Sequence, residues 1–173
     1  MGWDSLKVMS SPISSLYSHD AQLAPELSVV SWLNTKAELT LSALRGKVVM
    51  LDAFQMLCPG CVLRSLPQAS SLASLFEKDA FQVLGLHSVF EHHDVMTTDA
   101  LEAFVYEYKL SFPIAIDRHS TGTAIPQTML SYEMVGTPTT VLIDKSGKIR
   151  ARYFGSVKEE KVAAQIGYLL AEP

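Results

Sequence analysis

The sequence predicts an α/β fold in which a central mixed β-sheet is flanked by helices. Two apolar runs of strand length, residues 47–54 and 81–89, alternate with segments of helical periodicity. This alternation is typical of parallel strands joined by helices. Nearer the C-terminus, two apolar segments flank the turn Asp144-Lys145-Ser146-Gly147, which predicts an antiparallel hairpin. Parallel and antiparallel strands together predict one mixed sheet.

Length and composition are those of a globular domain. The chain has 173 residues, of which 48% are hydrophobic and 18% are charged. Its formal net charge of −4 argues against a general nucleic-acid binder, which would need a basic face. No apolar stretch reaches the roughly 18 to 20 residues that span a bilayer. We expect an irregular N-terminal arm over residues 1–24, then a single domain over residues 25–173, with no nucleic-acid partner and no membrane span.

The first half of the domain should contain a hairpin, a buried strand and a long helix. Residues 27–33 and 38–41 have strand character around a polar turn, which predicts an N-terminal β-hairpin extension. Residues 47–54 are apolar except for Asp52, as in a central strand that is covered on both faces. Leucines at helical spacing predict a helix over residues 59–78. We expect Pro67 to kink this helix, because proline lacks a backbone donor.

The second half should continue the alternation. Residues 81–89 predict a second buried strand, and an inserted helix and strand follow between about residues 91 and 117. Thr97 or Thr98 should cap the inserted helix. The final elements are the hairpin, over residues 139–143 and 148–154, and a helix over residues 157–170.

Both cysteines fall in one tetrapeptide, Cys58-Pro59-Gly60-Cys61, between the central strand and the long helix. Unpaired N–H groups and a partial positive charge at the start of a helix stabilise a thiolate at Cys58. The thiolate is the nucleophile of disulfide exchange. A structural zinc site would need four ligands, and the chain has no second cysteine pair. The motif therefore predicts a redox-active pair that implies no further cofactor, with Cys58 as the nucleophile and Cys61 as the resolving thiol.

Three separated features together resemble the thioredoxin superfamily. They are the strand before the cysteine motif, the segment Gly136-Thr137-Pro138-Thr139 before another strand, and the hairpin at residues 144–148. The segments at residues 24–27 and 41–49 and the insertion after residue 91 look like the TlpA-like and peroxiredoxin-related branch. The resemblance covers about residues 25–170. It implies a thioredoxin-like fold and a thiol-disulfide oxidoreductase that exchanges electrons with a protein or small-molecule disulfide and with an upstream donor or acceptor.

The resemblance also implies roles for particular residues. Pro138 should follow a cis bond and lie opposite the cysteines, so that Thr137 offers its backbone groups to a substrate. Asp52 matches the buried aspartate of thioredoxin, and burial would raise its pKa so that it accepts the proton of Cys61. The alternative is an aspartate that reaches solvent or caps a backbone group.

Further candidates for substrate contact adjoin the motif, and two of them depart from the family pattern. Leu57 stands where these proteins commonly carry Trp, which leaves the choice of partner open. Pro59 and Gly60 invert the Gly-Pro order of thioredoxin, and the direction of electron flow stays open. Gln55 occupies the position of a Thr that peroxiredoxins use to bind peroxide.

Two other functions compete with disulfide exchange. A thiol peroxidase would need the peroxiredoxin pattern, which Gln55 breaks. A non-catalytic binding or redox-switch module would use an apolar surface, for which the candidates are Met50, Met56, Leu57 and Met134.

A metal site and the cellular compartment are also considered. The metal-ligand types His87, Glu91, His92, His93 and Asp94 follow the second buried strand. Adjacent histidines rarely serve one ion, so we interpret this segment as a solvated or substrate-contacting loop without a metal. The N-terminus shows no signal peptide, which indicates a cytoplasmic location, or a periplasmic one if a signal has been removed.

Overall fold

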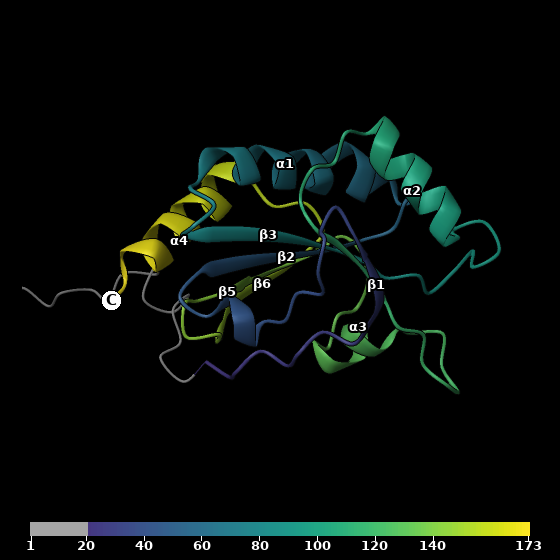
Figure 1. Ribbon diagram of the computed structural model, residues 1–173, viewed down its shortest axis with the longest axis horizontal. Helices are drawn as coiled ribbons and strands as arrows, with labels where there is room; N and C mark the ends of the chain where they lie inside the picture. The colour runs from purple at the N-terminus through teal and green to yellow at the C-terminus, as the bar shows by residue number, and fades with distance from the viewer. Residues whose placement is uncertain (1–20) are drawn as a thin grey trace, which may run out of the picture.

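A six-stranded mixed sheet forms the centre of the computed structural model, which describes residues 21–173 (Figure 1). The strands are β1 (Val29–Leu33), β2 (Val48–Phe54), β3 (Phe81–His87), β4 (Ile114–Asp117), β5 (Thr139–Ile143) and β6 (Ile149–Phe154). Their order across the sheet is β1-β4-β3-β2-β5-β6. Strands β2, β3 and β4 are parallel, whereas β1, β5 and β6 each run antiparallel to a neighbour. The predicted α/β fold with a mixed sheet is confirmed. The predicted arm lies mostly outside the described residues, so the domain boundary at residue 24 stays a prediction.

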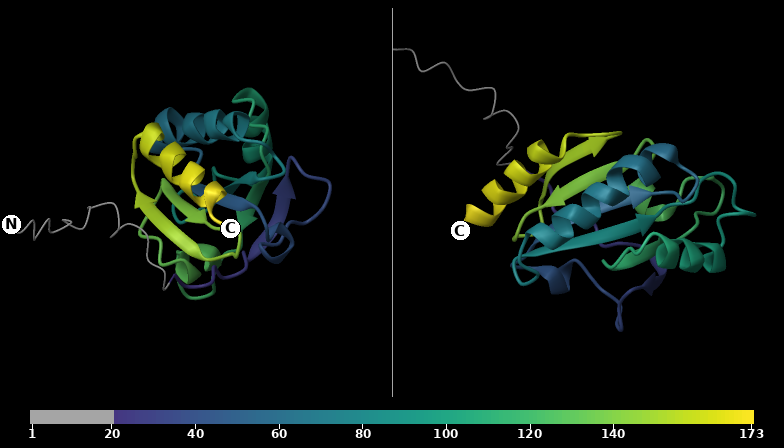
Figure 2. Two further views of the ribbon diagram at one scale, coloured as in Figure 1. Left: turned by 90° about the vertical axis from the view of Figure 1, so that its left-hand side faces the viewer. Right: turned by 90° about the horizontal axis from the view of Figure 1, so that it is seen from above.

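Helices cover both faces of this sheet. The helical segments are a 3-10 turn (Ser42–Leu44), a π-helix (Cys61–Ser65), α1 (Leu66–Leu75), α2 (Thr98–Glu107), α3 (Gln127–Ser131) and α4 (Glu159–Ala171). Figures 1 and 2 show α1, α2 and α4 on one face of the sheet and α3 on the other. Two hydrophobic clusters lie between these layers, one on each face. Within residues 21–173, no helix is long and apolar enough to cross a bilayer.

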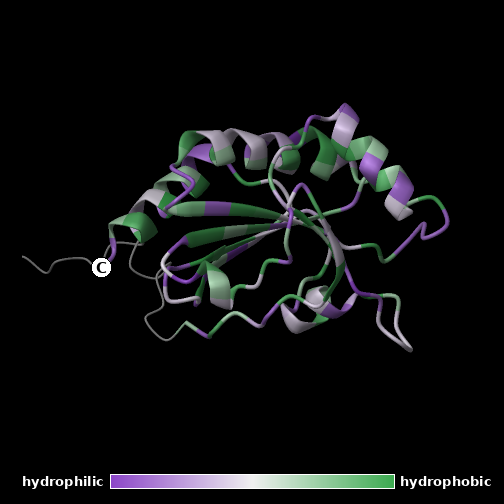
Figure 3. Ribbon diagram, in the orientation of Figure 1, coloured by the Kyte–Doolittle hydropathy of each residue, from purple (hydrophilic) through white to green (hydrophobic). Residues whose placement is uncertain are grey.

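Strand β2 is buried along its whole length, as its apolar run predicts. Alternate side chains point to opposite faces of a strand. Met50 and Phe54 accordingly belong to the cluster beneath α1 and α4, and Leu51 belongs to the cluster on the α3 side. Figure 3 shows the hydrophobic colouring of this central strand. The same alternation turns Asp52 toward the face that is covered by α1 and α4.

The predicted N-terminal β-hairpin is wrong. Residues 38–41 form no strand, and β1 pairs antiparallel with β4 instead. The Glu26 carboxylate accepts hydrogen bonds of 2.7 Å from the backbone N–H groups of Leu41 and Ser42. A side chain therefore takes donors that a hairpin would need, and the buried Leu41 side chain fixes the segment in the core.

The helix predicted over residues 59–78 contains a wide turn. The N–H of Leu66 donates to the carbonyl oxygen of Cys61, which defines the π-helix before α1. Pro67 lies in the first turn of α1, where a missing backbone donor is tolerated. Pro67 thus stands at the start of α1 rather than inside one continuous α-helix, and the kink expected there stays a prediction.

The other expected elements are present, with small shifts at their ends. Thr97 caps α2 by accepting a hydrogen bond from the N–H of Ala100. The inserted strand β4 pairs parallel with β3, as predicted. Helix α3 was not predicted, because five residues are too few to show a helical period.

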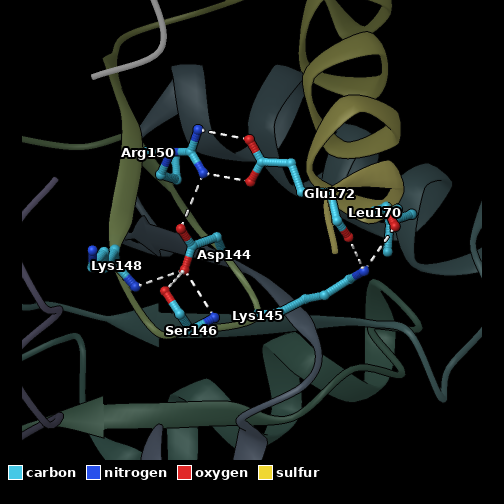
Figure 4. Close-up of polar contacts among 7 residues, drawn as sticks. All are labelled: Asp144, Lys145, Ser146, Lys148, Arg150, Leu170 and Glu172. Atoms are coloured by element: carbon cyan, nitrogen blue, oxygen red, sulfur yellow. Dashed lines mark hydrogen bonds and ion pairs between the residues drawn. The ribbon is translucent and has the colours of Figure 1, made fainter. Parts of the chain in front are cut away.

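A polar network attaches the end of α4 to the β5–β6 hairpin (Figure 4). Arg150 donates to both carboxylate oxygens of Glu172, at 2.6 and 2.9 Å, and to Asp144 at 3.1 Å. Lys145 donates to the carbonyl oxygens of Leu170 and Glu172. These contacts hold α4 against the sheet at the end of the chain.

Candidate active site

Cys58 and Cys61 lie where β2 passes into the first helical turn, and both are free thiols. Cys58 is partly exposed and Cys61 is fully buried. The backbone N–H of Cys61 donates to the Cys58 sulfur at 3.3 Å. Such a donor at the start of a helix favours a thiolate. The geometry thus provides an accessible sulfur with a covered partner behind it.

Cys61 differs from Cys58 in its electrostatic surroundings. Burial raises the pKa of the Cys61 thiol, and the nearby Cys58 side chain raises this pKa further. Cys61 is therefore protonated near neutral pH. It must lose a proton to a base before it can act as a nucleophile.

Pro138 lies opposite the cysteines and follows a cis peptide bond, as expected. The Cys58 thiol donates to the carbonyl oxygen of Thr137 across a distance of 3.5 Å. A Cβ atom on Gly60 would lie 3.3 Å from Cδ of Pro138 and 3.9 Å from the Cys58 sulfur. Gly60 therefore lets the motif approach Pro138 closely.

Asp52 is completely buried, so the alternative of an aspartate that reaches solvent is excluded. Burial raises its pKa to about 7, although the nearby hydroxyl groups of Thr140 and Ser65 act in the opposite direction. The Thr140 hydroxyl donates to Oδ1 at 3.0 Å. Asp52 shares a face of β2 with Met50, which belongs to the same core cluster as Cys61. The acid and the resolving cysteine thus lie on the same side of the sheet.

The other candidates around the motif differ in exposure. Leu57 is 57% exposed beside Cys58, and Pro59 is exposed as well. The Gln55 carbonyl accepts a hydrogen bond from the N–H of Cys58 at 3.2 Å. The Gln55 side chain is buried, and its Nε2 has no hydrogen-bond partner among the described residues. Leu57 and Pro59 are therefore open to solvent, whereas the Gln55 side chain is covered.

The methionines considered for an apolar binding surface are buried. Met50, Met56 and Met134 all lie in the hydrophobic clusters on the two faces of the sheet. Of the residues considered for that surface, Leu57 alone is exposed.

The histidine-rich segment divides into a buried residue and an exposed loop. His87 is 2% exposed, and burial lowers its pKa to about 4, so it is neutral. Residues 91–94 are exposed, and the His93 ring packs against the His119 ring with 5.1 Å between centroids. Across residues 21–173, no three His, Cys, Asp or Glu side chains are grouped to hold a metal ion.

Sequence reasoning missed Ser65 and Thr140, the two hydroxyl residues that act on Asp52. Thr140 is the direct partner of Asp52 in the β2–β5 register. The predicted strands contain Asp52 and Thr140, but the sequence does not show which positions of the two strands pair. Ser65 gives no signal of its own, because its place depends on the π turn.

Comparisons with known proteins show the family and the fold to which this chain is similar. The Redoxin family model matches residues 20–166. The thiol-disulfide oxidoreductase ResA of Bacillus cereus (strain ZK / E33L) is 31% identical over 147 residues, which cover 84% of this chain and 74% of that protein. A thioredoxin-like superfamily protein of known crystal structure is 48% identical, with a TM-score of 0.86 over 88% of this chain and 99% of that one. A thiol-disulfide isomerase from Corynebacterium glutamicum is 45% identical, with a TM-score of 0.85 over 89% of this chain and 99% of that one.

Proposed function

Because this chain belongs to the Redoxin family and is a thiol-disulfide oxidoreductase, we propose that Cys58 is its nucleophile and Cys61 its resolving thiol. The observation that carries the assignment is the contrast between the two sulfurs. Cys58 is accessible and accepts a backbone N–H at 3.3 Å, whereas Cys61 is fully buried behind it. A substrate disulfide can therefore reach Cys58 first.

The reaction takes place in two exchanges. The Cys58 thiolate attacks one sulfur of the substrate disulfide, whose other sulfur leaves with the electron pair as a thiolate. Cys61 then gives its proton to Asp52, and the Cys61 thiolate attacks the Cys58 sulfur of the mixed disulfide. The second substrate sulfur leaves as a thiolate, and a Cys58–Cys61 disulfide forms. Two electrons pass to the substrate, and the reverse sequence oxidises a dithiol. The two cysteine sulfurs carry the redox chemistry, so the reaction needs no resident cofactor.

The substrate surface surrounds the Cys58 sulfur. We assign backbone pairing with the substrate to Thr137, because its carbonyl lies 3.5 Å from that sulfur, next to Pro138. Leu57, Pro59 and Gly60 form the adjacent rim, with Gln55 beneath it. An aliphatic Leu57 in place of an aromatic residue favours partners with an apolar side chain beside the cysteine.

Trapping tests the two cysteine roles. Cys61→Ser should accumulate mixed disulfides with a disulfide-bonded substrate such as insulin, because no resolving thiol is present to release them. Cys58→Ser is the matched control and should form none. Covalent capture is measured by mass spectrometry under non-reducing conditions. Equal capture in both variants would contradict the assignment.

A peroxide assay distinguishes disulfide exchange from the alternative enzymatic function, a thiol peroxidase. We expect reduction of insulin disulfides to exceed consumption of hydrogen peroxide under the same donor, because Gln55 does not offer the peroxide-binding pattern. Peroxide turnover equal to insulin reduction, and lost in Cys58→Ser, would favour a thiol peroxidase.

A further inference from the structure

The buried Asp52 lies beneath a groove on the helical side of the sheet. This groove has a volume of about 670 Å³, and it is lined by the π turn and the start of α1, by Thr140, and by the segment that leads into α4. Figure 1 shows α1 and α4 on this side of the sheet. Ser65 and Thr140 both line the groove and both act on Asp52. Asp52 is therefore separated from the groove by two residues that bear hydroxyl groups.

Two buried polar atoms, one on Asp52 and one on Ser65, have hydrogen-bonding capacity that is not used. Oδ2 of Asp52 and Oγ of Ser65 are buried, and neither has a partner with hydrogen-bond geometry in the described part of the chain. Unpaired buried polar atoms are uncommon, because leaving them unpaired costs free energy. A hydroxyl can rotate, and it can both donate and accept. Ser65 is thus able to pass a proton between Oδ2 and the groove.

The π turn is what brings Ser65 to this position. Leu63 and Arg64 are exposed and Val62 is partly exposed, whereas Ser65 and Leu66 are both buried. The wider turn lets these two consecutive residues face inward. Leu66 fills the core cluster beneath α1, and Ser65 turns to the acid. Such π turns are frequent at functional sites.

The groove is distinct from the surface on which the substrate docks. Leu57, Cys58, Pro59, Gly60 and Thr137 are not among its lining residues. In the mixed disulfide the substrate covers Cys58 and its surroundings. A proton held on Asp52 then needs another way out, and the groove provides it.

We propose that Ser65 and Thr140 are positioning residues that hold the Asp52 carboxyl and connect it to this groove. The inference rests on the proposed function, in which Cys61 gives its proton to Asp52. Asp52 passes that proton through the Ser65 hydroxyl to solvent in the groove, so the acid is ionised again for the next turnover. The electrons move separately, from the Cys61 thiolate to the sulfur that leaves.

The charged surroundings of this route are mixed. On the groove, the charged side chains are Arg64, Lys158, Glu159 and Glu160. On the neighbouring strands, Asp52 pairs with Gly85 of β3 and Thr140 of β5, neither of which carries a titratable side chain. On the face of the sheet that is covered by α1 and α4, the titratable side chains are Cys61, His87 of β3 and Tyr153 of β6. The groove therefore carries both cationic and anionic side chains next to solvent.

The test isolates the second exchange. The reduced protein is mixed with an excess of 5,5′-dithiobis(2-nitrobenzoate), and release of the first and second nitrothiobenzoate is followed by stopped flow from pH 5 to 9. In Ser65→Ala and Thr140→Val we expect the second release to slow by about three- to tenfold at pH 7, because the Asp52 carboxylate loses a neighbouring hydroxyl group that favours its ionised form. The midpoint of the pH profile should move upward, and the first release should keep its wild-type rate.

Three further variants make the result specific. Ser65→Thr and Thr140→Ser keep the hydroxyl and should restore the wild-type profile. Ser70→Ala removes an α1 hydroxyl that donates to the Leu66 carbonyl and does not line the groove, so it should change nothing. In an Asp52→Asn background, Ser65→Ala should cause no further loss. A wild-type profile in Ser65→Ala, or a further loss in that background, would overturn the proposal. A first release from Cys58→Ser at the wild-type rate would instead overturn the proposed function, because Cys61 would then be the accessible nucleophile.

Discussion

Asp52 and Thr140 are paired across two neighbouring strands, with 3.0 Å between the carboxylate oxygen and the hydroxyl. They are direct partners in the antiparallel register of β2 and β5. Strand β5 begins immediately after Pro138, so one strand brings Pro138 to the nucleophile and Thr140 to the buried acid. A one-residue slip would turn Thr140 to the opposite face, so the register of this strand pair sets both halves of the site.

Replacing Asp52 with Asn should stabilise the protein at neutral and alkaline pH. Burial raises the pKa of Asp52 from 3.8 to about 7, so the folded state favours the protonated acid. The free energy of unfolding therefore falls as pH rises from about 4 to about 7. Asn keeps an acceptor for Thr140 and carries no charge. We expect a gain on the order of 4 kcal/mol at pH 8, and little at pH 4, from urea unfolding. An equal gain at both pH values would show that desolvation of the carboxylate is not the cause.

Alkylation should distinguish the two cysteines. At pH 7, iodoacetamide should label Cys58 and leave Cys61 unmodified in the folded protein. Cys61 is fully buried, and burial raises its pKa. In Cys58→Ser we expect labelling to be at least about tenfold slower than in the wild type. Peptide mapping identifies the site, and labelling of both residues in urea serves as the control. Equal labelling of both thiols in the folded protein would contradict the roles proposed for them.

The centre of the fold and the redox motif are predictable from the sequence because they depend on local patterns. A strand buried on both faces needs a continuous apolar run, which residues 48–54 provide. A single acid within such a run is conspicuous, and Asp52 is indeed fully buried. The cysteine spacing and the turn before β6 are equally local.

The features that the sequence did not reveal depend on contacts between distant residues. Glu26 binds the backbone of Leu41 and Ser42, which removes the expected hairpin partner of β1. Ser65 reaches Asp52 because a π turn shifts its direction, and Thr140 does so because of strand register. Such relationships need the assembled sheet. They are the part of the site that periodicity and spacing cannot supply.

His87 should make the protein sensitive to acid. Burial lowers its pKa from 6.5 to about 4, so the folded state favours neutral imidazole. The stability that depends on this neutral form is lost as pH falls from about 6.5 to about 4, by roughly 3 kcal/mol in total. Protonation of Asp52, whose pKa is raised from 3.8 to about 7, acts in the opposite direction over this whole range, so a variant is needed to isolate the effect.

His87→Gln provides that comparison. Between pH 7 and pH 4.5 the free energy of unfolding of the variant should rise relative to that of the wild type, on top of a cost that does not depend on pH. That cost arises from the lost packing of His87 against Phe54, whose ring centroid lies 5.3 Å away. His119→Gln, at an exposed position, is the control and should follow the wild type. The measurement is urea unfolding at both pH values, and parallel changes in the wild type and His87→Gln would refute the prediction.

Arg150→Met should destabilise the attachment of α4 without altering disulfide exchange. The Arg150 side chain is 6% exposed and bridges Asp144 and Glu172 (Figure 4). Removing one partner of a buried ion pair costs about 3 kcal/mol, because the remaining charge is left without compensation. Asp144 keeps the N–H groups of Ser146 and Lys148 as donors, which limits the loss. We expect a decrease of about 2 to 3 kcal/mol in the free energy of unfolding, measured by urea denaturation at pH 7.

A second arginine on the same strand is the matched control for this change. Arg152 pairs with the exposed Glu133 at 3.8 Å, and exposed ion pairs contribute little. Arg152→Met should therefore cost less than about 1 kcal/mol. In Arg150→Met the free energy of unfolding should also decrease less as the pH falls. Hydrogen bonds and the Arg150 charge outweigh burial and hold the pKa of Asp144 below its usual value, a benefit that the wild type loses as pH falls through that pKa. If Arg150→Met proved as stable as the wild type, the desolvation cost of the three charges would cancel their attraction, and hydrophobic packing of α4 would be what holds the end of the chain.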